Sequence, residues 1–217
     1  MFRVDLHTHS SASHDGGITE AQYMQLVGED TLDYIAVTDH DTISMATHLH
    51  KTLGDKIIVG QEITTDDGEI IGLFLKEEVQ ANLPIKKAAE EVKRQGGLVY
   101  IPHPFETFRK GVSKKSLDQI DEFVDIVEAY NGRAFFQNKG PEATVWARLN
   151  SKPIAASSDA HGIKGIGNAY TTVKEPPNKH NLVQLLEVGY MNTNRPPIRS
   201  LLYPKVHRLR RKLGGKE

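Results

Sequence analysis

Asp5-Leu6-His7-Thr8-His9 follows directly on a short apolar run, and its spacing guides the interpretation of the whole chain. In a β-strand alternate side chains share a face, so His7 and His9 can point in the same direction. Ser158-Asp159-Ala160-His161 repeats this geometry after the apolar residues 153–156. Both segments therefore predict a strand that ends in a pair of metal-binding side chains.

Two further segments, Thr38-Asp39-His40-Asp41 and His103-Pro104, contain the same residue types. Imidazole and carboxylate together suit zinc, manganese or iron, and a site with several such ligands usually holds more than one ion. The chain has no cysteine, so any metal must be bound through nitrogen and oxygen atoms. The four segments together predict one metal site that catalyses a hydrolysis.

Short apolar runs alternate with segments of helical periodicity, which is typical of a parallel α/β fold. Several runs are continuously apolar, as buried parallel strands should be. Asp66-Asp67-Gly68 predicts the tight turn of a β-hairpin, an antiparallel interruption that argues against a regular eight-fold barrel. The expected strands are residues 3–7, 34–38, 57–62, 69–75, 98–101, 126–130 and 154–157, and the expected helices are residues 19–27, 84–95, 135–149 and 181–187.

The histidines and several carboxylates stand where these expected strands end. His40 follows the second strand, Glu62 ends the third, and His103 follows the fifth. Active sites of parallel α/β folds form at the carboxyl ends of the strands. Residues that are far apart in the sequence are therefore expected to converge in space.

The composition fits one globular domain and does not indicate a particular function. The 217 residues are 38% apolar and 25% charged, and the formal net charge of -1 names no partner. We expect a cytoplasmic protein, because the first strand leaves no room for a signal peptide and no apolar run reaches transmembrane length. The expected organisation is a compact domain over residues 1–200 and a basic C-terminal extension over residues 201–217.

The C-terminal segment 205–213 is strongly basic. Such a cluster attracts nucleic acid or an anionic membrane surface. An equally weighted alternative is a solvated, mobile extension, because charge runs near chain termini are usually disordered. Aromatic residues are sparse in this segment, which argues against a dedicated RNA-binding element.

With these segments placed, the chain resembles the PHP family, named for the polymerase and histidinol phosphatase proteins that share a phosphoesterase domain. The resemblance covers about residues 2–175 and rests on the four segments above, which occur in the family's order. Each segment alone is weak, but the ordered set is specific. The resemblance implies a distorted (β/α)7 TIM-like barrel of the PHP type. It also implies a free-standing metal-dependent phosphoesterase with two or three divalent ions, which would be manganese, zinc or iron.

The resemblance further implies which side chains bind the ions, with Glu62 and Asp159 as bridges. Many family members have another histidine in the strand after the bridging glutamate, and Glu69 stands in that segment here. Either Glu69 substitutes as a ligand, or the third ion is weaker or absent. The positions that match the family's ligands are His7, His9, Asp15, His40, Glu62, His103, Asp159 and His161.

Phosphoester hydrolysis needs a nucleophile at neutral pH, and a metal-bridging hydroxide is the expected attacker because bound divalent ions lower the pKa of water. We expect His40, Asp159 or His161 to protonate the leaving oxygen. Asp39 is expected to accept a hydrogen bond from a ligating imidazole. The remaining histidines are expected at the surface or in capping positions, namely His14, His48, His50, His180 and His207.

A phosphate ester also needs a cationic clamp. Arg133 follows a predicted strand and is the first choice, because a guanidinium can bind phosphate through two hydrogen bonds. Arg109 and Lys110, in the loop after His103, are the second choices. Glu128 is expected either to support the metal ligands or to have a structural role.

The predicted substrate is a small phosphomonoester, or a nucleotide or short oligonucleotide ester. One alternative is a metal-dependent amidohydrolase, which also begins with an HxH strand, although the Asp-His pairs and Arg133 favour phosphate. Another alternative is a non-catalytic metal-bound protein that holds RNA or a membrane through its basic tail. The near-complete set of ligand positions argues against that second alternative.

Overall fold

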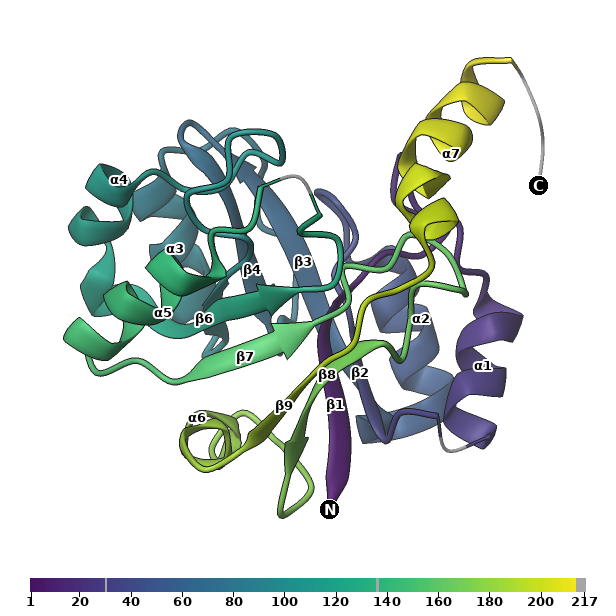
Figure 1. Cartoon of the computed structure of the whole chain (residues 1–217), viewed down its shortest axis with the longest axis horizontal. Helices are drawn as coiled ribbons and strands as arrows, with labels where there is room; N and C mark the ends of the chain where they lie inside the picture. Colours follow the sequence, from purple (N-terminus) through teal and green to yellow (C-terminus); the bar gives the residue numbers. More distant parts are fainter. Residues whose placement is uncertain (30, 136, 214–217) are drawn as a thin grey trace.

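The computed structural model describes residues 1–29, 31–135 and 137–213. Its strands are β1 (Phe2–Thr8), β2 (Tyr34–Val37), β3 (Ile57–Thr65), β4 (Gly68–Leu73), β5 (Leu98–Ile101), β6 (Val124–Asn131), β7 (Ile154–Ser157), β8 (Ala169–Val173) and β9 (Tyr190–Thr193). Within the described residues they form one nine-stranded sheet in the order β7-β6-β5-β4-β3-β2-β1-β8-β9 (Figure 1).

Helices cover the strands on the two flanks of the molecule (Figure 1). The α-helices are α1 (Glu20–Gly28), α2 (Ser44–Leu53), α3 (Ile85–Arg94), α4 (Lys114–Gln119), α5 (Gly140–Leu149), α6 (Leu182–Glu187) and α7 (Tyr203–Lys212), and the 3-10 helices are η1 (Gly54–Lys56), η2 (Asp121–Phe123) and η3 (Ile198–Leu202). Over the described ranges, no helix combines the length and the apolar character needed to cross a lipid bilayer.

The sheet curls into a barrel that is nearly closed. β1, β2 and β3 pair in parallel, and so do β5, β6 and β7. The chain leaving β7 returns to β1, because the Asp159 N–H donates to the carbonyl of His7 and the His9 N–H donates to that of Ala160, both at 2.9 Å. These contacts confirm the predicted distorted α/β barrel of seven strands, with β8 and β9 added outside it as antiparallel strands.

β4 is the one barrel strand that pairs antiparallel with both of its neighbours in the described sheet. Thr65 pairs with Gly68, so Asp66 and Asp67 form a two-residue turn, and the predicted hairpin is confirmed. Because β4 runs against the other barrel strands, its first residues lie at the edge of the barrel where the parallel strands end. Glu69 is thereby carried to the same edge as the predicted metal ligands.

Apolar side chains fix the helices against this barrel. α3 and α5 pack on β5 and β6 through residues such as Val92, Val99 and Trp146. α1 and α2 pack on β2 through Leu26, Ile35 and Leu49. Burying the parallel strands under helices explains their continuously apolar sequences.

Some expected elements differ from the observed ones. The helix predicted over residues 135–149 begins only at Gly140, with Pro141 in its first turn, so the prediction was wrong for residues 135 and 137–139, while residue 136 lies outside the described residues. Proline fits the first helical turn but cannot continue a helix from the preceding residues. β8 and β9 were not predicted, because their alternating or half-exposed residues form no continuous apolar run.

The basic C-terminal segment forms α7, which projects from the body in Figure 1. One side of the helix nevertheless docks on the barrel. A Cβ added to Gly17 would lie 2.0 Å from Cε1 of His207, and one added to Gly162 would lie 2.5 Å from Cδ2 of Tyr203. His207 is therefore buried, and the expectation of a surface position for it was wrong.

Candidate metal centre

The eight side chains predicted to bind metal lie together at one end of the barrel. His7 lies in β1 and Glu62 in β3, and the other six stand on loops that follow the strands. Their ligand atoms form groups within 4.8 Å, which are His7 with His9 and Asp159, His7 with Glu62 and His103, His9 with Asp15, His40 and His161, and His40 with Glu62 and Glu69. The expected convergence is therefore found, while the ligand role of each side chain stays a prediction.

Two imidazoles face each other within the cluster. Nε2 of His7 lies 3.1 Å from Nε2 of His9. Oε2 of Glu62 lies 3.3 Å and 3.2 Å from these two nitrogens. Oδ1 of Asp159 lies 3.6 Å and 3.4 Å from them. Two nitrogen lone pairs at this distance repel each other unless a proton or a metal cation lies between them.

These spacings fit a divalent cation. Zinc binds imidazole nitrogen and carboxylate oxygen at about 2.0–2.2 Å, so neighbouring ligand atoms around one ion are separated by roughly 3.0–3.5 Å. The distances from His7 and His9 to each other, to Glu62 and to Asp159 run from 3.1 to 3.6 Å. The donor set, nitrogen and carboxylate oxygen without sulfur, suits zinc, manganese or iron equally.

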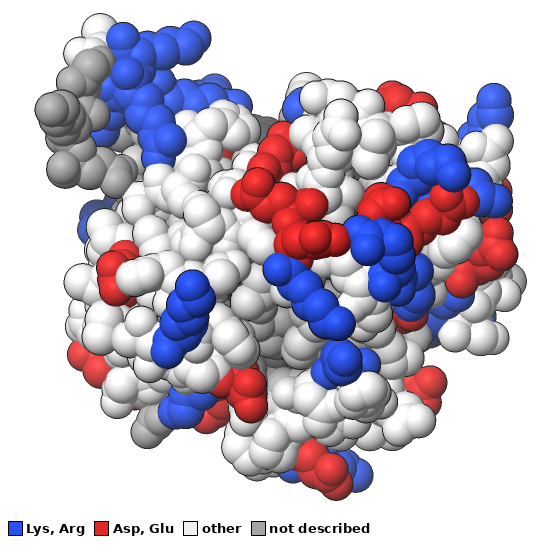
Figure 2. Space-filling model, turned by 180° about the vertical axis from the view of Figure 1, so that it is seen from behind, with Lys and Arg blue, Asp and Glu red and all other residues white. Residues whose placement is uncertain are grey.

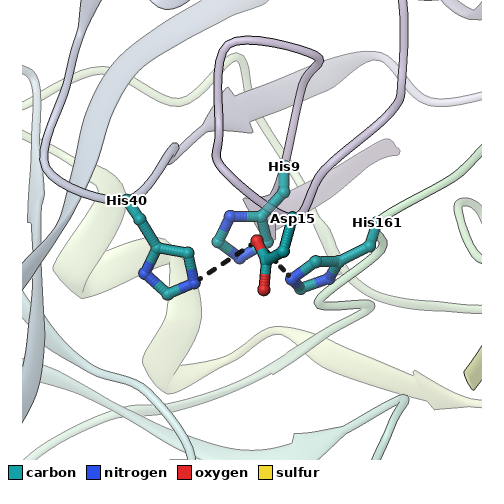
Figure 3. A group of neighbouring side chains, drawn as sticks. All are labelled: His9, Asp15, His40 and His161. Carbon is teal, nitrogen blue, oxygen red and sulfur yellow. Dashed lines mark ion pairs between the residues drawn. The ribbon is translucent and has the colours of Figure 1, made fainter. Parts of the chain in front are cut away.

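A second group adjoins the first (Figure 3). Oδ1 of Asp15 lies 3.3 Å from Nε2 of His161 and 3.7 Å from Nε2 of His40. The other ring nitrogen of His161 lies 3.0 Å from the backbone carbonyl of Asp159. This contact orients the His161 ring so that Nε2 faces Asp15, as an anchored metal-binding histidine requires.

Glu69 reaches a third group from the reversed strand β4. Its Oε1 lies 3.7 Å from Nδ1 of His40, and Oε2 of Glu62 lies 3.4 Å from the same nitrogen. Burial and the charge of Glu62 raise the pKa of Glu69 to about 8. A carboxyl in such a place holds either a proton or a cation at pH 7. This position supports the alternative in which Glu69 replaces the histidine of other family members.

Burial also adjusts the protonation of the imidazoles. It lowers the pKa of His40 to about 4 and that of His161 to about 3. Both rings are therefore neutral at pH 7, and each has a free nitrogen lone pair for a metal. For His9 the burial effect is outweighed by hydrogen bonds to Asp159 and Glu62, which raise its pKa to about 9. A proton thus binds His9 strongly where a metal ion would compete for the same nitrogen.

A buried carboxylate outside the predicted ligand set orients His7. Oε1 of Glu128 lies 3.2 Å from Nδ1 of His7, which directs Nε2 of that ring towards the cluster. Glu128 therefore supports a predicted metal ligand, one of the two roles expected for it.

The hydrogen bond expected between Asp39 and a ligating imidazole is not found, so that prediction was wrong. The Asp39 carboxylate accepts hydrogen bonds from the backbone N–H and the hydroxyl of Ser10, at 2.6 and 2.5 Å. Among the described residues no imidazole donates a hydrogen bond to it.

Two of the clustered residues have a left-handed backbone. His103 has φ of 30° and Asp159 has φ of 50°, and both stand just after a strand. Side chains other than glycine rarely adopt this conformation, and it costs of order 1–3 kcal/mol. Such strain persists where the surroundings hold a side chain in a particular direction, and here both side chains are directed at the cluster.

The cluster opens into a cavity of about 150 Å³. The three cations predicted to bind phosphate, Arg109, Lys110 and Arg133, all line it. Arg109 donates to Asp159 at 2.8 Å, to Asn131 at 2.5 Å and to Glu106 at 2.5 Å. Lys110 is mostly exposed, with its Nζ 3.5 Å from Glu69.

Arg133 is held less completely than Arg109. Its Nη1 lies 3.3 Å from both carboxylate oxygens of Asp159, and its buried Nε has no hydrogen-bond partner within the described chain. A buried donor without a partner is uncommon in folded proteins, so the described residues satisfy this guanidinium only in part.

Several cavity residues were not predicted. Phe108, Pro204 and Arg208 line the cavity, and Asn131 donates to Glu128 at 2.8 Å and to Asp159 at 3.3 Å. His14 is mostly exposed, as expected, yet its ring centroid lies 4.8 Å from that of His40. The α7 residues gave no local indication of their position, because the helix reaches the site only through long-range packing.

Comparisons with known proteins identify a related family and related sequences. Residues 141–189 match the family described as PHP-associated. The uncharacterized protein MJ0417 of Methanocaldococcus jannaschii is 34% identical over 177 residues, which cover 80% of this chain and 71% of that protein. The match therefore includes most of both sequences.

Solved structures share the fold at low sequence identity. A two-domain protein from Bacteroides vulgatus, which contains a predicted PHP-like metal-dependent phosphoesterase, has a TM-score of 0.71 at 19% identity. That match covers 89% of this chain and 65% of the other, so this chain spans less than two thirds of its length. The lesion-specific endonuclease PfuEndoQ from Pyrococcus furiosus has a TM-score of 0.60 at 16% identity, with 88% and 57% covered. Motif order, barrel and relatives together place this chain in the PHP-domain family.

Proposed function

We propose that this protein is a metal-dependent phosphoesterase that hydrolyses small phosphomonoesters, or nucleotide and short oligonucleotide esters. The observation that supports this most is the sharing of one cavity by the His and carboxylate cluster and by two arginines beside Asp159. Carboxylates and imidazoles suit divalent cations, whereas guanidinium groups suit phosphate. The combination matches the charges of a phosphate ester better than those of a neutral amide.

The eight predicted ligands and Glu69 would hold the ions. Glu62 belongs to two of the groups, and Oδ1 of Asp159 lies 3.4 Å from Nδ1 of His161 in the neighbouring group. Bound divalent ions would activate a water molecule and offset the charge that develops on the phosphoryl oxygens. Glu128 would keep the His7 ring in the orientation that this requires. The burial of most side chains of the cluster strengthens the electrostatic contacts among them.

The two arginines have different roles in this proposal. Arg133 binds a non-bridging phosphoryl oxygen, since it lines the cavity and its contacts with Asp159 are long, at 3.3 Å. Arg109 is engaged by Glu106, Asn131 and Asp159, so it positions the Asp159 carboxylate. Lys110 is exposed beside Glu69 and contributes to the positive rim of the cavity. The proposed donor of the proton to the leaving oxygen is His40, Asp159 or His161, or a water molecule bound to one of them.

The test is phosphate release from a panel of phosphomonoesters, phosphodiesters, mononucleotides and short oligonucleotides, with protein loaded separately with manganese, zinc and iron. Asp159→Ala should lose the activity, and Asp55→Ala, which changes an exposed aspartate in η1, should retain it. Turnover of a cyclic amide without turnover of any ester would favour an amidohydrolase. No turnover of either, in protein that elemental analysis shows to contain at least two ions, would favour a binding protein.

A further inference from the structure

A second cavity adjoins the metal-site cavity and has a different character. Its volume is about 350 Å³, and it shares Phe108, Arg109, Arg133, Pro204 and Arg208 with the metal-site cavity. Its own lining adds residues of η3 and α7 together with Phe135. Because the two cavities share these walls, a group attached to a phosphate at the metal cluster could extend directly into the second cavity.

The helix α7 that forms one wall of this second cavity is docked, and the docking involves the loops of the metal site. His207 packs on Gly17, two residues after Asp15, and Tyr203 packs on Gly162, next to His161. The Arg211 guanidinium donates to the carbonyl of Ser11 in the same loop as Asp15. The position of α7 is therefore tied to the segments that hold two predicted metal ligands.

The second cavity is apolar on its walls and positive at its rim. Phe108, Leu201, Leu202 and Pro204 supply apolar surface. α7 has five Lys and Arg residues and no acidic residue, and Figure 2 shows its cations gathered on the projecting end of the molecule. Lys205 and Arg208 line the cavity, and neither forms an ion pair within the described chain, whereas the one acidic lining residue, Glu106, is bound by Arg109.

We propose that this second cavity binds the leaving group of the substrate, and that Arg208, assisted by Lys205, binds a second anionic group on it. The inference rests on the proposed phosphoesterase function and narrows its substrate class. The preferred ester has an aromatic or apolar leaving group that carries a negative charge of its own. The apolar walls accommodate the ring, and the side chains of Arg208 and Lys205, which form no ion pair with the described residues, offset the charge.

Two substrates that differ mainly in that charge provide the test, namely phenyl phosphate and 4-carboxyphenyl phosphate. The wild-type protein should show a higher kcat/KM for the carboxylated ester. Arg208→Ala should lower the ratio of the two kcat/KM values by about five- to tenfold, which corresponds to the loss of one charge-assisted contact. Arg208→Lys should restore part of the ratio.

Arg210→Ala is the matched control, because Arg210 is an exposed arginine on the same helix that lines neither cavity. It should leave the ratio unchanged. An equal ratio in wild type and Arg208→Ala would overturn the proposal even if both esters were hydrolysed.

If wild-type protein hydrolysed neither of these esters nor any other ester of the panel described above, the proposed function would fail separately. Dissociation constants of the two esters, measured by calorimetry on the metal-loaded protein, would then decide the question for the second cavity. Tighter binding of 4-carboxyphenyl phosphate that is lost in Arg208→Ala would support it, and equal binding of the two compounds would refute it.

Discussion

Glu128 accepts four hydrogen bonds from groups that are far apart in the sequence. They come from the His7 ring at 3.2 Å, the Tyr100 hydroxyl at 2.9 Å, the His103 backbone N–H at 2.7 Å and the Asn131 amide at 2.8 Å. Burial raises the pKa of Glu128, but the His7 charge and hydrogen bond outweigh it and lower that pKa below its ordinary value. A single ionised carboxylate thus aligns two predicted metal ligands.

Replacing this carboxylate by an amide should weaken metal binding without unfolding the protein. In Glu128→Gln one acceptor oxygen becomes an NH₂ group, so at least one of the four donors loses its partner. Changes to groups that orient metal ligands typically cost 10–100-fold in metal affinity, and we expect a loss in roughly that range. Competition with a chromophoric chelator measures it.

Glu122→Gln is the control for this experiment, because Glu122 is an exposed residue of η2 that pairs with Lys86. Its metal affinity should equal that of the wild type. If Glu128→Gln also kept full affinity, the orienting role of Glu128 would be excluded.

At the scale of elements, the sequence predicts the parallel strands and the loops that follow them. β5 and β7 are short, mainly apolar and largely buried, so their composition indicates them. β1 is longer and contains charged residues, and its HxH spacing indicates it instead. The convergence of His7, His103 and Asp159 follows from the shared direction of these strands. The antiparallel strand β4 was predictable as well, because Asp66-Asp67-Gly68 before it is typical of a hairpin turn.

The elements that the sequence does not predict depend on contacts between distant segments. Buried and half-buried residues alternate along β8, and the strand forms by pairing with β1, which is distant in the sequence. α7 has many charged residues and only a small buried face. Its sequence therefore looks like that of a solvated tail. The fits of His207 against Gly17 and of Tyr203 against Gly162, with the Arg211 contact to Ser11, fix the place of the helix, and no local sequence pattern relates the residues of these pairs. Arg208 was missed for the same reason.

The docking of α7 should be sensitive to a single methyl group. In Gly17→Ala the new Cβ would lie 2.0 Å from the His207 ring, so either the ring or the helix must move. We expect trypsin to release peptides from residues 203–213 at least about ten times faster than in the wild type, because cleavage follows the population of the opened helix. Mass spectrometry of the released peptides measures the rate.

Gly28→Ala provides the comparison, since a Cβ at the end of α1 meets no atom within 4 Å. Its cleavage rate should match the wild type. An unchanged rate in Gly17→Ala would mean that α7 is not held by His207.

At the scale of the whole molecule, the barrel concentrates buried carboxyl groups at one end. Glu62, Asp159, Asp15 and Glu69 are each no more than 5% exposed. Buried carboxylates are costly unless cations accompany them. The stability of the fold should therefore depend on bound metal.

Adding manganese or zinc to chelator-treated protein should raise the melting temperature. At a free metal concentration about 100 times Kd, binding contributes about 2.7 kcal/mol, which corresponds to roughly 5–10 °C for a chain of this size. Differential scanning calorimetry measures the shift. Asp159→Asn should show a smaller shift, because one oxygen of the cluster is replaced. Equal melting temperatures with and without metal would argue against a metal site here.

The contact between Arg211 and Ser11 joins points 200 residues apart along the chain. At a synthesis rate of about 5–20 residues per second, roughly 10–40 s separate the appearance of these two residues. During that interval the loop that holds Asp15 has been made but lacks its cover. The set of predicted metal ligands is complete only when His161 has been made, which is 50 residues before Arg211. At the same rate, a nascent chain could gather all eight ligands roughly 3–10 s before it acquires a complete substrate pocket.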